Sequence, residues 1–509
     1  MESVETAEEG RPRPRLAAWD YVERALDLDL THPLAFAALA VIYVVSRVPW
    51  LDLGYGTDPD AWRVALTGEY LLSEGEYFPS RLPGFPLHEL VTLPLLPFGW
   101  VWTNLSTVVV SLAGVYVFAR IVRELGLPYR GLLTLGFAFT PLLWINSVST
   151  MDYMWALTCL LACYLALMKE RTLLGGVALG LATGFRLTSL WAAPAFLLWL
   201  WRERRLRREG LPFACALAVT SLVAYSPVLA RYGIDAFNFY DAKVGFLSFL
   251  RLLGKETLGV LGALAVLAGL AVSLPRLTRL PRDLADDSHV ALWVAMGVLF
   301  FVSFTRLPHE VAYLIPIFPF AFFFMARYLH RAALAAVVAL IVLAGFVDVT
   351  SPGDEINRET FTNARVGEGM LLSDIDTLEN QRAFADEIAA LDVPPHSVVL
   401  TGFIYPQLVM RHKDRLEIGI LERDYEAISM LSDRGEAVDR EKDIRYVWLL
   451  KYDAFQELRS QGYRFFYVPD AGKSNASVFG YRPAYFGATK LTLSRETASD
   501  AEGTAKTDR

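Results

Sequence analysis

The sequence predicts an α-helical multi-pass membrane protein that carries a C-terminal α/β domain outside the membrane. The 509-residue chain is 54% hydrophobic and 13% aromatic, with a mean hydropathy of +0.34. This composition is too apolar for a soluble protein of such length. Apolar runs near the length of a membrane span recur from 33 to 349, whereas residues 350–509 are rich in charge, Gly and Pro.

The apolar pattern divides the chain into four parts. Residues 1–32 are predicted to be a cytoplasmic leader, because they are polar, lack a cleavable signal pattern and precede a span-sized apolar run. Residues 33–349 form the transmembrane domain, with a first outer loop over 52–100. Residues 350–495 alternate β-rich runs with helical stretches, which is typical of a small α/β domain. The polar residues 496–509 are predicted to be disordered.

The charge distribution excludes one class of partner. The net charge is −7, and residues 350–509 hold 27 Asp or Glu against 20 Lys or Arg, which leaves 28 of each type in the rest of the chain. The acidic excess therefore belongs to the C-terminal part. Because no basic face is present, we expect no nucleic-acid partner.

Basic segments set the predicted orientation. They precede the first apolar run or separate later runs, and they cover 11–15, 120–130, 169–172, 202–208, 276–282 and 327–331. By the positive-inside rule these segments face the cytoplasm. The N-terminus is then cytoplasmic, and the C-terminal domain is extracytoplasmic.

The stretch between the basic segments 169–172 and 202–208 is predicted to be a broken hairpin. Its length, about 30 residues, suits one tilted span but not two full ones. Two short helices that break near Gly184, Phe185 and Arg186 would return the chain to the cytoplasmic side. The break would hold Arg186 toward the outer face. With the hairpin counted as two, we expect about eleven membrane helices.

Ionisable residues gather at the outer ends of the predicted spans, where they are costly unless they pair or function. These residues are Asp58, Asp60, Arg63, Arg81, His88, Glu89, Asp152, Arg186, Arg306, His309 and Glu310. Arginine forks two hydrogen bonds to phosphate, and a carboxylate can take a proton from an attacking hydroxyl. Together they suit displacement of a lipid phosphate from a sugar carbon by an alcohol.

Each candidate also has a structural alternative. Asp60 and Asp152 both precede helical stretches and could act as N-caps. Asp58 could be a structural or accessory residue, since Pro59 fixes the chain between it and Asp60. Arg81 could bind lipid head groups, and Arg186 could pair with a carboxylate merely to hold the hairpin.

The later outer segment has its own alternative, and metal binding is a separate question. Arg306, His309 and Glu310 could form a tight charged turn. No spacing of His or Cys specifies zinc, so we predict no metal-ligand set. The DxD pattern of Asp58 and Asp60 leaves a divalent cation open as a cofactor.

The same segments resemble a known enzyme family. They are "TDPDAWRVALTGEYLLSEGEYFPSRLPGFPLHELVTLPLLPFG", "NSVSTMDYMWALTCLLACYLAL", "GGVALGLATGFRLTSLWAAPAFLLWL" and "LPHEVAYLIPIFPF". In this order they resemble the GT-C membrane glycosyltransferases that use polyprenyl-phosphate sugars, particularly the bacterial and archaeal relatives of protein O-mannosyltransferases and the lipid A aminoarabinose transferase. The resemblance covers about residues 33–349.

The resemblance implies an inverting transfer of a sugar from a dolichyl or undecaprenyl phosphate donor. The acceptor would be a glycan, lipid or protein outside the membrane. Asp60 matches the family's first-loop catalytic carboxylate, with Asp58 beside it, and Asp152 matches an acid that orients the acceptor or a base partner. Arg81 and Arg186 match basic residues that meet the donor phosphate.

Further residues and departures complete the comparison. Arg306 would join the phosphate-binding set, and Arg63, His309 and Glu310 would be accessory. Ala61 stands where aminoarabinose transferases have a second acid, and no acid lies beside Arg81. The sequence therefore specifies neither that substrate nor mannose.

Two other classes stay open on the sequence. A transporter or flippase of a lipid-linked sugar would use the same arginines without a catalytic base, although the chain shows no internal repeat. A non-catalytic membrane anchor could present the outer domain to partners. An anchor would leave the clustered charges at the membrane face unexplained.

Overall fold

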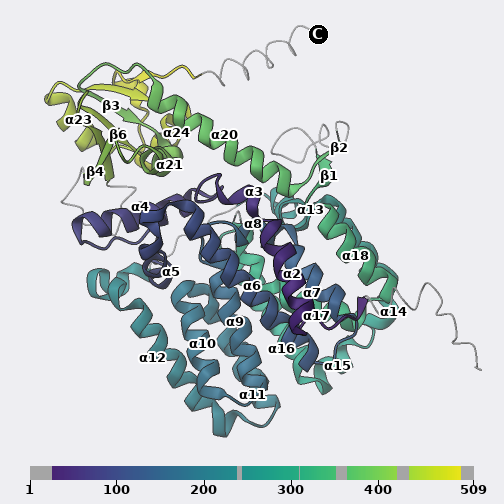
Figure 1. Ribbon diagram of the computed structural model, residues 1–509. Helices are drawn as coiled ribbons and strands as arrows, with labels where there is room; N and C mark the ends of the chain where they lie inside the picture. The colour runs from purple at the N-terminus through teal and green to yellow at the C-terminus, as the bar shows by residue number, and fades with distance from the viewer. Residues whose placement is uncertain (1–25, 238–243, 309, 351–363, 421–434, 494–509) are drawn as a thin grey trace, which may run out of the picture.

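The computed structural model describes residues 26–237, 244–308, 310–350, 364–420 and 435–493 (Figure 1). Over these residues the chain is mostly helical, with a mixed sheet in its C-terminal part. The predicted leader lies mainly outside the described residues, and the predicted disordered tail lies wholly outside them.

Apolar helices build the body of the protein. Within the described ranges, four are long and apolar enough to cross a membrane: α6 (Trp100–Glu124), α12 with η3 (Leu206–Phe237), α13 (Phe246–Val272), and η4 with α17 (Val311–Tyr328). A fifth crossing results if Leu274–Asp286 and Ser288–Phe304 (α16), bent by 103°, count as one. The chain is therefore a membrane protein. The larger number of about eleven stays a prediction.

Shorter helices fill the space between the long ones. Apolar helices of 10–17 residues are α2 (Pro33–Val45), α7 (Arg130–Phe139), α9 (Tyr153–Met168), α10 (Thr172–Phe185) and α18 (Arg331–Leu343). The other helices of the body are α3 (Val48–Leu51), α4 (Pro59–Glu74), α5 (Pro86–Thr92), η1 (Leu93–Phe98), α8 (Pro141–Ser147), η2 (Leu187–Trp191), α11 (Ala192–Arg202), α14 (Leu274–Leu277) and α15 (Leu280–Asp286).

The broken hairpin occurs where the sequence predicted it. Helix α10 ends at Phe185, Arg186 is extended (φ −151°, ψ 113°), and η2 and α11 follow. Arg205, just after α11, donates from Nη2 to the Leu167 carbonyl oxygen at 2.9 Å, near the start of α10. The chain therefore leaves and returns at the same end of the body, with Arg186 at the far end.

Close packing holds this hairpin against α12. A Cβ atom on Gly176 would lie 2.5 Å from the Phe213 carbonyl oxygen, and one on Gly180 would lie 2.4 Å from Thr220 Cβ. The two helices can approach this closely because small residues line the contact, a device common between helices in lipid.

The basic loops meet at one end of the body. Lys169 pairs with Glu124 at 2.5 Å, and Arg123 pairs with Asp29 at 3.5 Å. Figure 1 places α11 and α15 at this end, away from the C-terminal sheet. The structure thus has one end with the predicted cytoplasmic loops and another with the sheet. Which end faces outward remains the prediction of the positive-inside rule.

The C-terminal part contains two sheets joined by a long helix. Strands β1 (Val347–Thr350) and β2 (Arg365–Glu368) form an antiparallel pair that leads into α20 (Met370–Ala390). A six-stranded sheet follows, in the order β4-β5-β6-β3-β7-β8. Its strands are β3 (Ser397–Leu400), β4 (Leu416–Ile420), β5 (Gly435–Asp439), β6 (Ile444–Val447), β7 (Arg464–Tyr467) and β8 (Thr489–Lys490).

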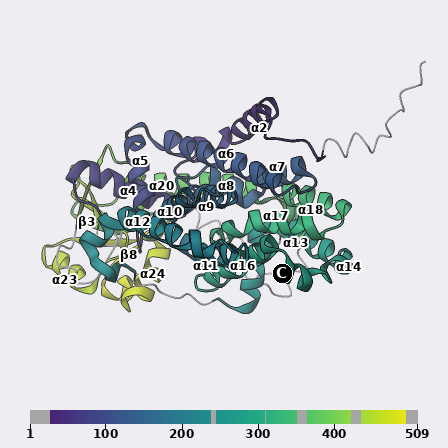
Figure 2. The ribbon, with the colours of Figure 1, turned by 90° about the horizontal axis from the view of Figure 1, so that it is seen from below.

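Helices connect the strands of this sheet. They are η5 (Gly402–Ile404), α21 (Tyr405–Arg411), α23 (Tyr452–Ser460), α24 (Pro469–Phe479) and η6 (Pro483–Phe486). Strand β3 pairs in parallel with β6 and β7, so the strand–helix–strand character predicted for this part is confirmed. In Figures 1 and 2, α14 and α18 lie on the side of the molecule away from this sheet.

The predicted orientation can be tested by labelling single cysteines. In a chain whose native cysteines are replaced by Ala, we expect Glu457→Cys on α23 to react with a membrane-impermeant maleimide in intact cells. We expect Glu203→Cys, in the basic loop after α11, to react only after the membrane is permeabilised, because Lys- and Arg-rich loops stay in the cytoplasm. The opposite labelling pattern would reverse the topology and contradict an outer site.

Candidate functional site

The predicted first outer loop enters α4 through Asp58. The Asp58 carboxylate accepts a hydrogen bond from the Asp60 backbone N–H at 2.9 Å, and Pro59 occupies the first helical position. Asp58 is therefore the N-cap, and the alternative that gave this role to Asp60 is wrong. The Asp60 side chain, on the first turn, is left to point toward other charged groups.

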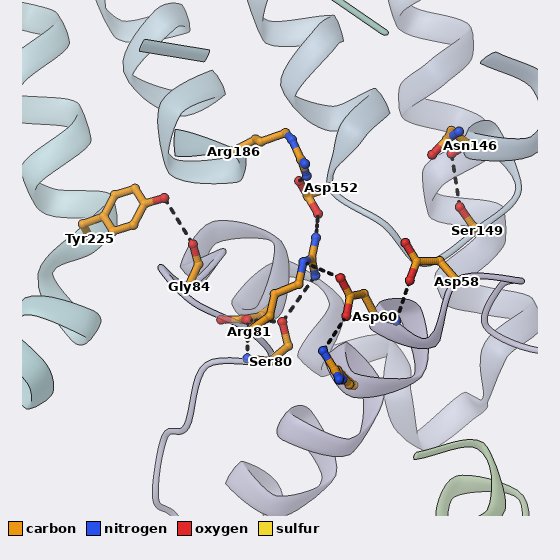
Figure 3. Close-up of polar contacts among 12 residues, drawn as sticks. Asp58, Asp60, Ser80, Arg81, Gly84, Asn146, Ser149, Asp152, Arg186 and Tyr225 are labelled. Carbon is orange, nitrogen blue, oxygen red and sulfur yellow. Dashed lines mark hydrogen bonds and ion pairs between the residues drawn. The ribbon is translucent and has the colours of Figure 1, made fainter. Parts of the chain in front are cut away.

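Four charged side chains form a continuous chain of ion pairs (Figure 3). Asp60 Oδ2 contacts Arg81 Nε at 3.0 Å, Arg81 Nη2 contacts Asp152 Oδ1 at 2.5 Å, and Arg186 Nη1 contacts Asp152 Oδ2 at 2.7 Å. Arg63 Nη1 extends the chain by bonding the other oxygen of Asp60 at 2.8 Å. We call these residues the Asp–Arg chain. They come from four separate segments of the sequence.

Burial makes this pairing obligatory for Asp152. Its side chain is 0% exposed, and the Arg186 side chain is 5% exposed. The backbone of Asp152 occupies the N-cap position of α9, but its side chain makes no capping hydrogen bond, because both of its oxygens are engaged by arginines. The alternative that the Asp152 side chain only caps α9 is thus wrong. Arg81 is also largely buried, which contradicts the alternative that it faces lipid head groups.

Aromatic rings cover the arginines. The Arg81 guanidinium carbon lies 3.7 Å from the centre of the Phe85 ring. The Arg186 guanidinium carbon lies 3.7 Å from the Tyr153 ring centre and 4.4 Å from that of Tyr313. Arginine tolerates such burial because its flat, weakly hydrated guanidinium stacks on π faces. None of these rings was predicted as a site residue, although Phe85 and Tyr153 lie within the segments that carry the family resemblance.

A buried glutamate shapes the loop that carries Arg81. Glu89 accepts hydrogen bonds from the Ser80 N–H at 2.8 Å and the Ser80 hydroxyl at 2.6 Å, and also one from the Tyr77 hydroxyl. These bonds fold residues 77–89 into a closed loop. The loop fixes Ser80 and therefore places Arg81, its neighbour, between Asp60 and Asp152.

Several buried nitrogen atoms in this region lack a partner among the described residues. They are Nε of Arg63, Nε of Arg186, and both ring nitrogens of His88, which is fully buried. Buried donors are normally satisfied in folded proteins. The unsatisfied N–H groups of two arginines of the Asp–Arg chain therefore leave hydrogen-bonding capacity for an anion.

A polar cavity of about 530 Å³ lies beside the Asp–Arg chain. Asp58, Tyr153 and Glu310 line the wall nearest the chain, and Tyr153 is also the ring that covers Arg186. Other lining residues come from α8 and the turn after it, and from α13, β1, β2 and α20; they include Asn146, Ser149, Arg251, Lys255, Asp348, Glu368, Ser373, Asp374 and Thr377. The cavity is large enough for one or two sugar units by ordinary ligand-site dimensions.

The carboxyl group of Asp58, on this wall, has a raised pKa. Its burial, together with the neighbouring charges of Asp60 and Glu310, raises the pKa of Asp58 to about 8. Glu310 also accepts a hydrogen bond from the Ala312 N–H at 3.2 Å, which caps η4. Asp58, the N-cap of α4, and Glu310, the N-cap of η4, thus both line the cavity but belong to different elements.

Of the remaining predicted residues, Arg306 is not a member of the Asp–Arg chain. Arg306 is exposed, and no ion pair among the described residues joins it to Asp60 or Asp152. His309 lies outside the described residues. Among those described, no group of three or more His, Cys, Asp or Glu is placed to hold a metal ion.

The fold and site together define a mostly helical membrane protein with alternating acidic and basic side chains buried beside a polar cavity. Comparisons with known proteins assign the chain to no family, since no protein-family model and no curated protein matches it. Among solved structures, the chain is similar to ArnT from Cupriavidus metallidurans, crystallised bound to undecaprenyl phosphate, at 16% identity and a TM-score of 0.42. The alignment covers 70% of this chain and 66% of that chain, and it does not establish a common fold.

The raised pKa of Asp58 predicts how stability depends on pH. The folded chain holds a proton on Asp58 up to about pH 8, whereas an unfolded Asp releases it near its ordinary value of 3.8. Unfolding therefore releases a proton between about pH 4 and pH 8, and the free energy of unfolding falls as pH rises through that window. The variant Asp58→Asn keeps an N-cap acceptor but has no such proton.

We therefore expect the native chain to lose more thermal stability than Asp58→Asn when the pH is raised from about 5 to about 8. Melting temperatures in detergent, followed by intrinsic fluorescence at several pH values, measure this difference. Parallel pH profiles for the two proteins would contradict a proton held by Asp58.

Proposed function

We propose that this protein is a membrane glycosyltransferase that moves a sugar from a polyprenyl phosphate, dolichyl or undecaprenyl, to a hydroxyl of an extracytoplasmic acceptor. The observation that carries the proposal is the Asp–Arg chain, buried next to a polar cavity at the end of the helices where the C-terminal sheet lies. A catalytic site of this kind needs cationic side chains that bind the phosphate and, close to them, a carboxylate that accepts the proton of the attacking hydroxyl.

Arg81 and Arg186 would bind the donor phosphate. Both guanidinium groups are already withdrawn from water and held against aromatic rings. A phosphate that displaces a carboxylate oxygen from either arginine would therefore meet oriented donors without further desolvation of the arginine. The unsatisfied Nε–H of Arg186 adds one donor. Donors held in place in this way stabilise the charge that collects on a departing phosphate.

Asp60 would act as the general base. In the structure its two oxygens are shared by Arg63 and Arg81. When a phosphate takes over Arg81, Asp60 keeps only Arg63, and its freed oxygen can accept a hydrogen bond from a nearby hydroxyl. Asp60 then takes the acceptor's hydroxyl proton while the acceptor oxygen bonds the anomeric carbon from the face opposite the phosphate. The carbon–oxygen bond to phosphate breaks, its electron pair stays on the phosphate, and the sugar configuration inverts.

The cavity would hold the acceptor and the transferred sugar. Asp58 and Glu310 line it next to the Asp–Arg chain and can accept hydrogen bonds from sugar hydroxyls. Asp152 would keep Arg81 and Arg186 in place rather than contact the acceptor, because both of its oxygens are committed to them. The acceptor class, whether glycan, lipid or protein, is left open by this arrangement.

Two further lines support the proposal. The segments that carry Asp60, Arg81, Asp152 and Arg186 are those that resemble the polyprenyl-phosphate-dependent GT-C glycosyltransferases. The basic loops at the opposite end of the helices favour an outer location for the site, where a lipid-linked donor needs no nucleotide. A transporter or flippase of the same lipid would need the arginines but no base.

Transfer from radiolabelled polyprenyl-phosphate sugars tests the proposal in membranes that contain equal amounts of each variant. We expect the native chain to transfer label and Asp60→Asn to lose about 10²- to 10⁴-fold in rate, the usual contribution of a general base. The matched control is Glu69→Gln on the same helix, whose side chain pairs with Lys413 away from the Asp–Arg chain. This variant should keep nearly the native rate.

Each alternative has its own result. Equal rates for native and Asp60→Asn would remove Asp60 from catalysis. No transfer from any donor, combined with native-dependent movement of the lipid-linked sugar across the membrane, would replace the enzyme by a transporter.

A further inference from the structure

The C-terminal sheet region contacts the first outer loop next to the Asp–Arg chain. Trp448, which directly follows β6, is 6% exposed. The Arg63 guanidinium carbon lies 4.0 Å from the centre of the Trp448 ring, and Arg63 Nη1 bonds Asp60 Oδ1 at 2.8 Å. A side chain from the soluble part thus covers the arginine that holds the proposed base.

Phe403 supports the Trp448 ring, with 5.2 Å between the ring centres and an angle of 62° between the ring planes. The Arg63 side chain is therefore bounded by Asp60 on one side and by an aromatic ring on the other. Such a cation–π contact limits the positions that a guanidinium can occupy.

A second contact reaches the residue before Asp58. The Thr57 hydroxyl donates to the Asp374 carboxylate on α20, which also accepts from Trp50 Nε1 at 3.1 Å. Gln381, two turns further along α20, donates from Nε2 to the Thr57 carbonyl oxygen at 3.0 Å. Both the side chain and the backbone of Thr57 are therefore fixed by α20 at the entrance to α4.

A third contact at the same interface reaches no site residue. Lys413, just after α21, pairs with Glu69 at 3.0 Å on the third turn of α4, and their side chains are 35% and 28% exposed. This ion pair joins the sheet region to α4, and within the described part of the chain no hydrogen bond or ion pair connects it to Asp60 or Arg63. The interface therefore contains two contacts that reach residues of the site, at Arg63 and Thr57, and a third, Lys413–Glu69, that only joins the two parts.

We propose that Trp448 and Asp374 are positioning residues, through which the C-terminal sheet region completes the transferase site by fixing Arg63 and Thr57, and hence Asp60 and Asp58. This inference rests on the proposed function and gives the C-terminal part a role in it. Trp448 acts through Arg63, and Asp374, although it lines the cavity, acts through Thr57 because its carboxylate is bound by the Thr57 hydroxyl and Trp50 Nε1. They restrict the first turn of α4 so that the Asp60 carboxylate keeps one orientation while a phosphate displaces it from Arg81.

The expected effect lies in turnover rather than in donor binding. Without the Trp448 ring, Arg63 gains rotational freedom and water, and Asp60 loses a fixed partner. Misplacement of a catalytic group by about 1 Å can cost about 10²-fold in rate. Arg81 and Arg186 keep their own aromatic covers, so the KM for the donor should change little.

The test compares Trp448→Leu, Trp448→Phe and Lys413→Gln in the full chain, with undecaprenyl- or dolichyl-phosphate sugars as donor. We expect kcat to fall at least about 10-fold in Trp448→Leu with KM within about 2-fold, near-native kcat in Trp448→Phe because the aromatic face is kept, and native kcat in Lys413→Gln. Equal losses in Trp448→Leu and Lys413→Gln, or no rescue by Phe, would overturn the positioning role.

Hydrogen exchange gives a second readout that needs no substrate. Peptides over residues 57–66 should exchange faster in Trp448→Leu and in Asp374→Ala than in the native chain, and unchanged in Lys413→Gln. Unchanged exchange in the first two variants overturns the inference even if the chain transfers sugar. Faster exchange in a chain that transfers no sugar keeps the coupling and rejects only the proposed function.

Discussion

A carboxylate withdrawn from water at the end of the membrane helices constrains the rest of the site. The Asp152 side chain has no exposed surface, so its charge must be balanced by protein groups. Arg81 reaches it from a loop that Glu89 folds back, and Arg186 reaches it from the break between α10 and η2. The two segments meet because the hairpin of α10 and α11 has its break, at Arg186, beside Asp152.

The arrangement that satisfies Asp152 is also the one in which we propose that phosphate binds. The arginines are desolvated, stacked on aromatic rings and joined to acids that a phosphate can replace. The chain of ion pairs continues from Asp60 to Arg63, whose guanidinium group contacts the Trp448 ring. The C-terminal sheet region is therefore in contact with the Asp–Arg chain of the membrane part. This arrangement would suit the proposed transferase, because the cavity proposed to hold the acceptor is lined by residues of both parts.

Charge and hydropathy patterns in the sequence predicted the membrane body, the break at Arg186 and the α/β part, since these depend on composition and local periodicity. They also selected Asp60, Arg81, Asp152 and Arg186, because each charge is costly near lipid. Which residue caps a helix, and which side chains are exposed, depends on how segments far apart in the sequence pack together. The sequence therefore could not assign the N-cap to Asp58, exclude Arg306 from the Asp–Arg chain, or foresee Trp448 against Arg63.

The proposed function requires Arg81 and Arg186 to exchange carboxylate partners for a lipid phosphate. An electron cryo-microscopy structure of the full chain in lipid nanodiscs with undecaprenyl monophosphate tests this exchange most directly. We expect phosphate density in contact with both guanidinium groups and an opened pair between Arg81 and Asp60. Phosphate bound elsewhere, with every ion pair of the Asp–Arg chain intact, would contradict the exchange.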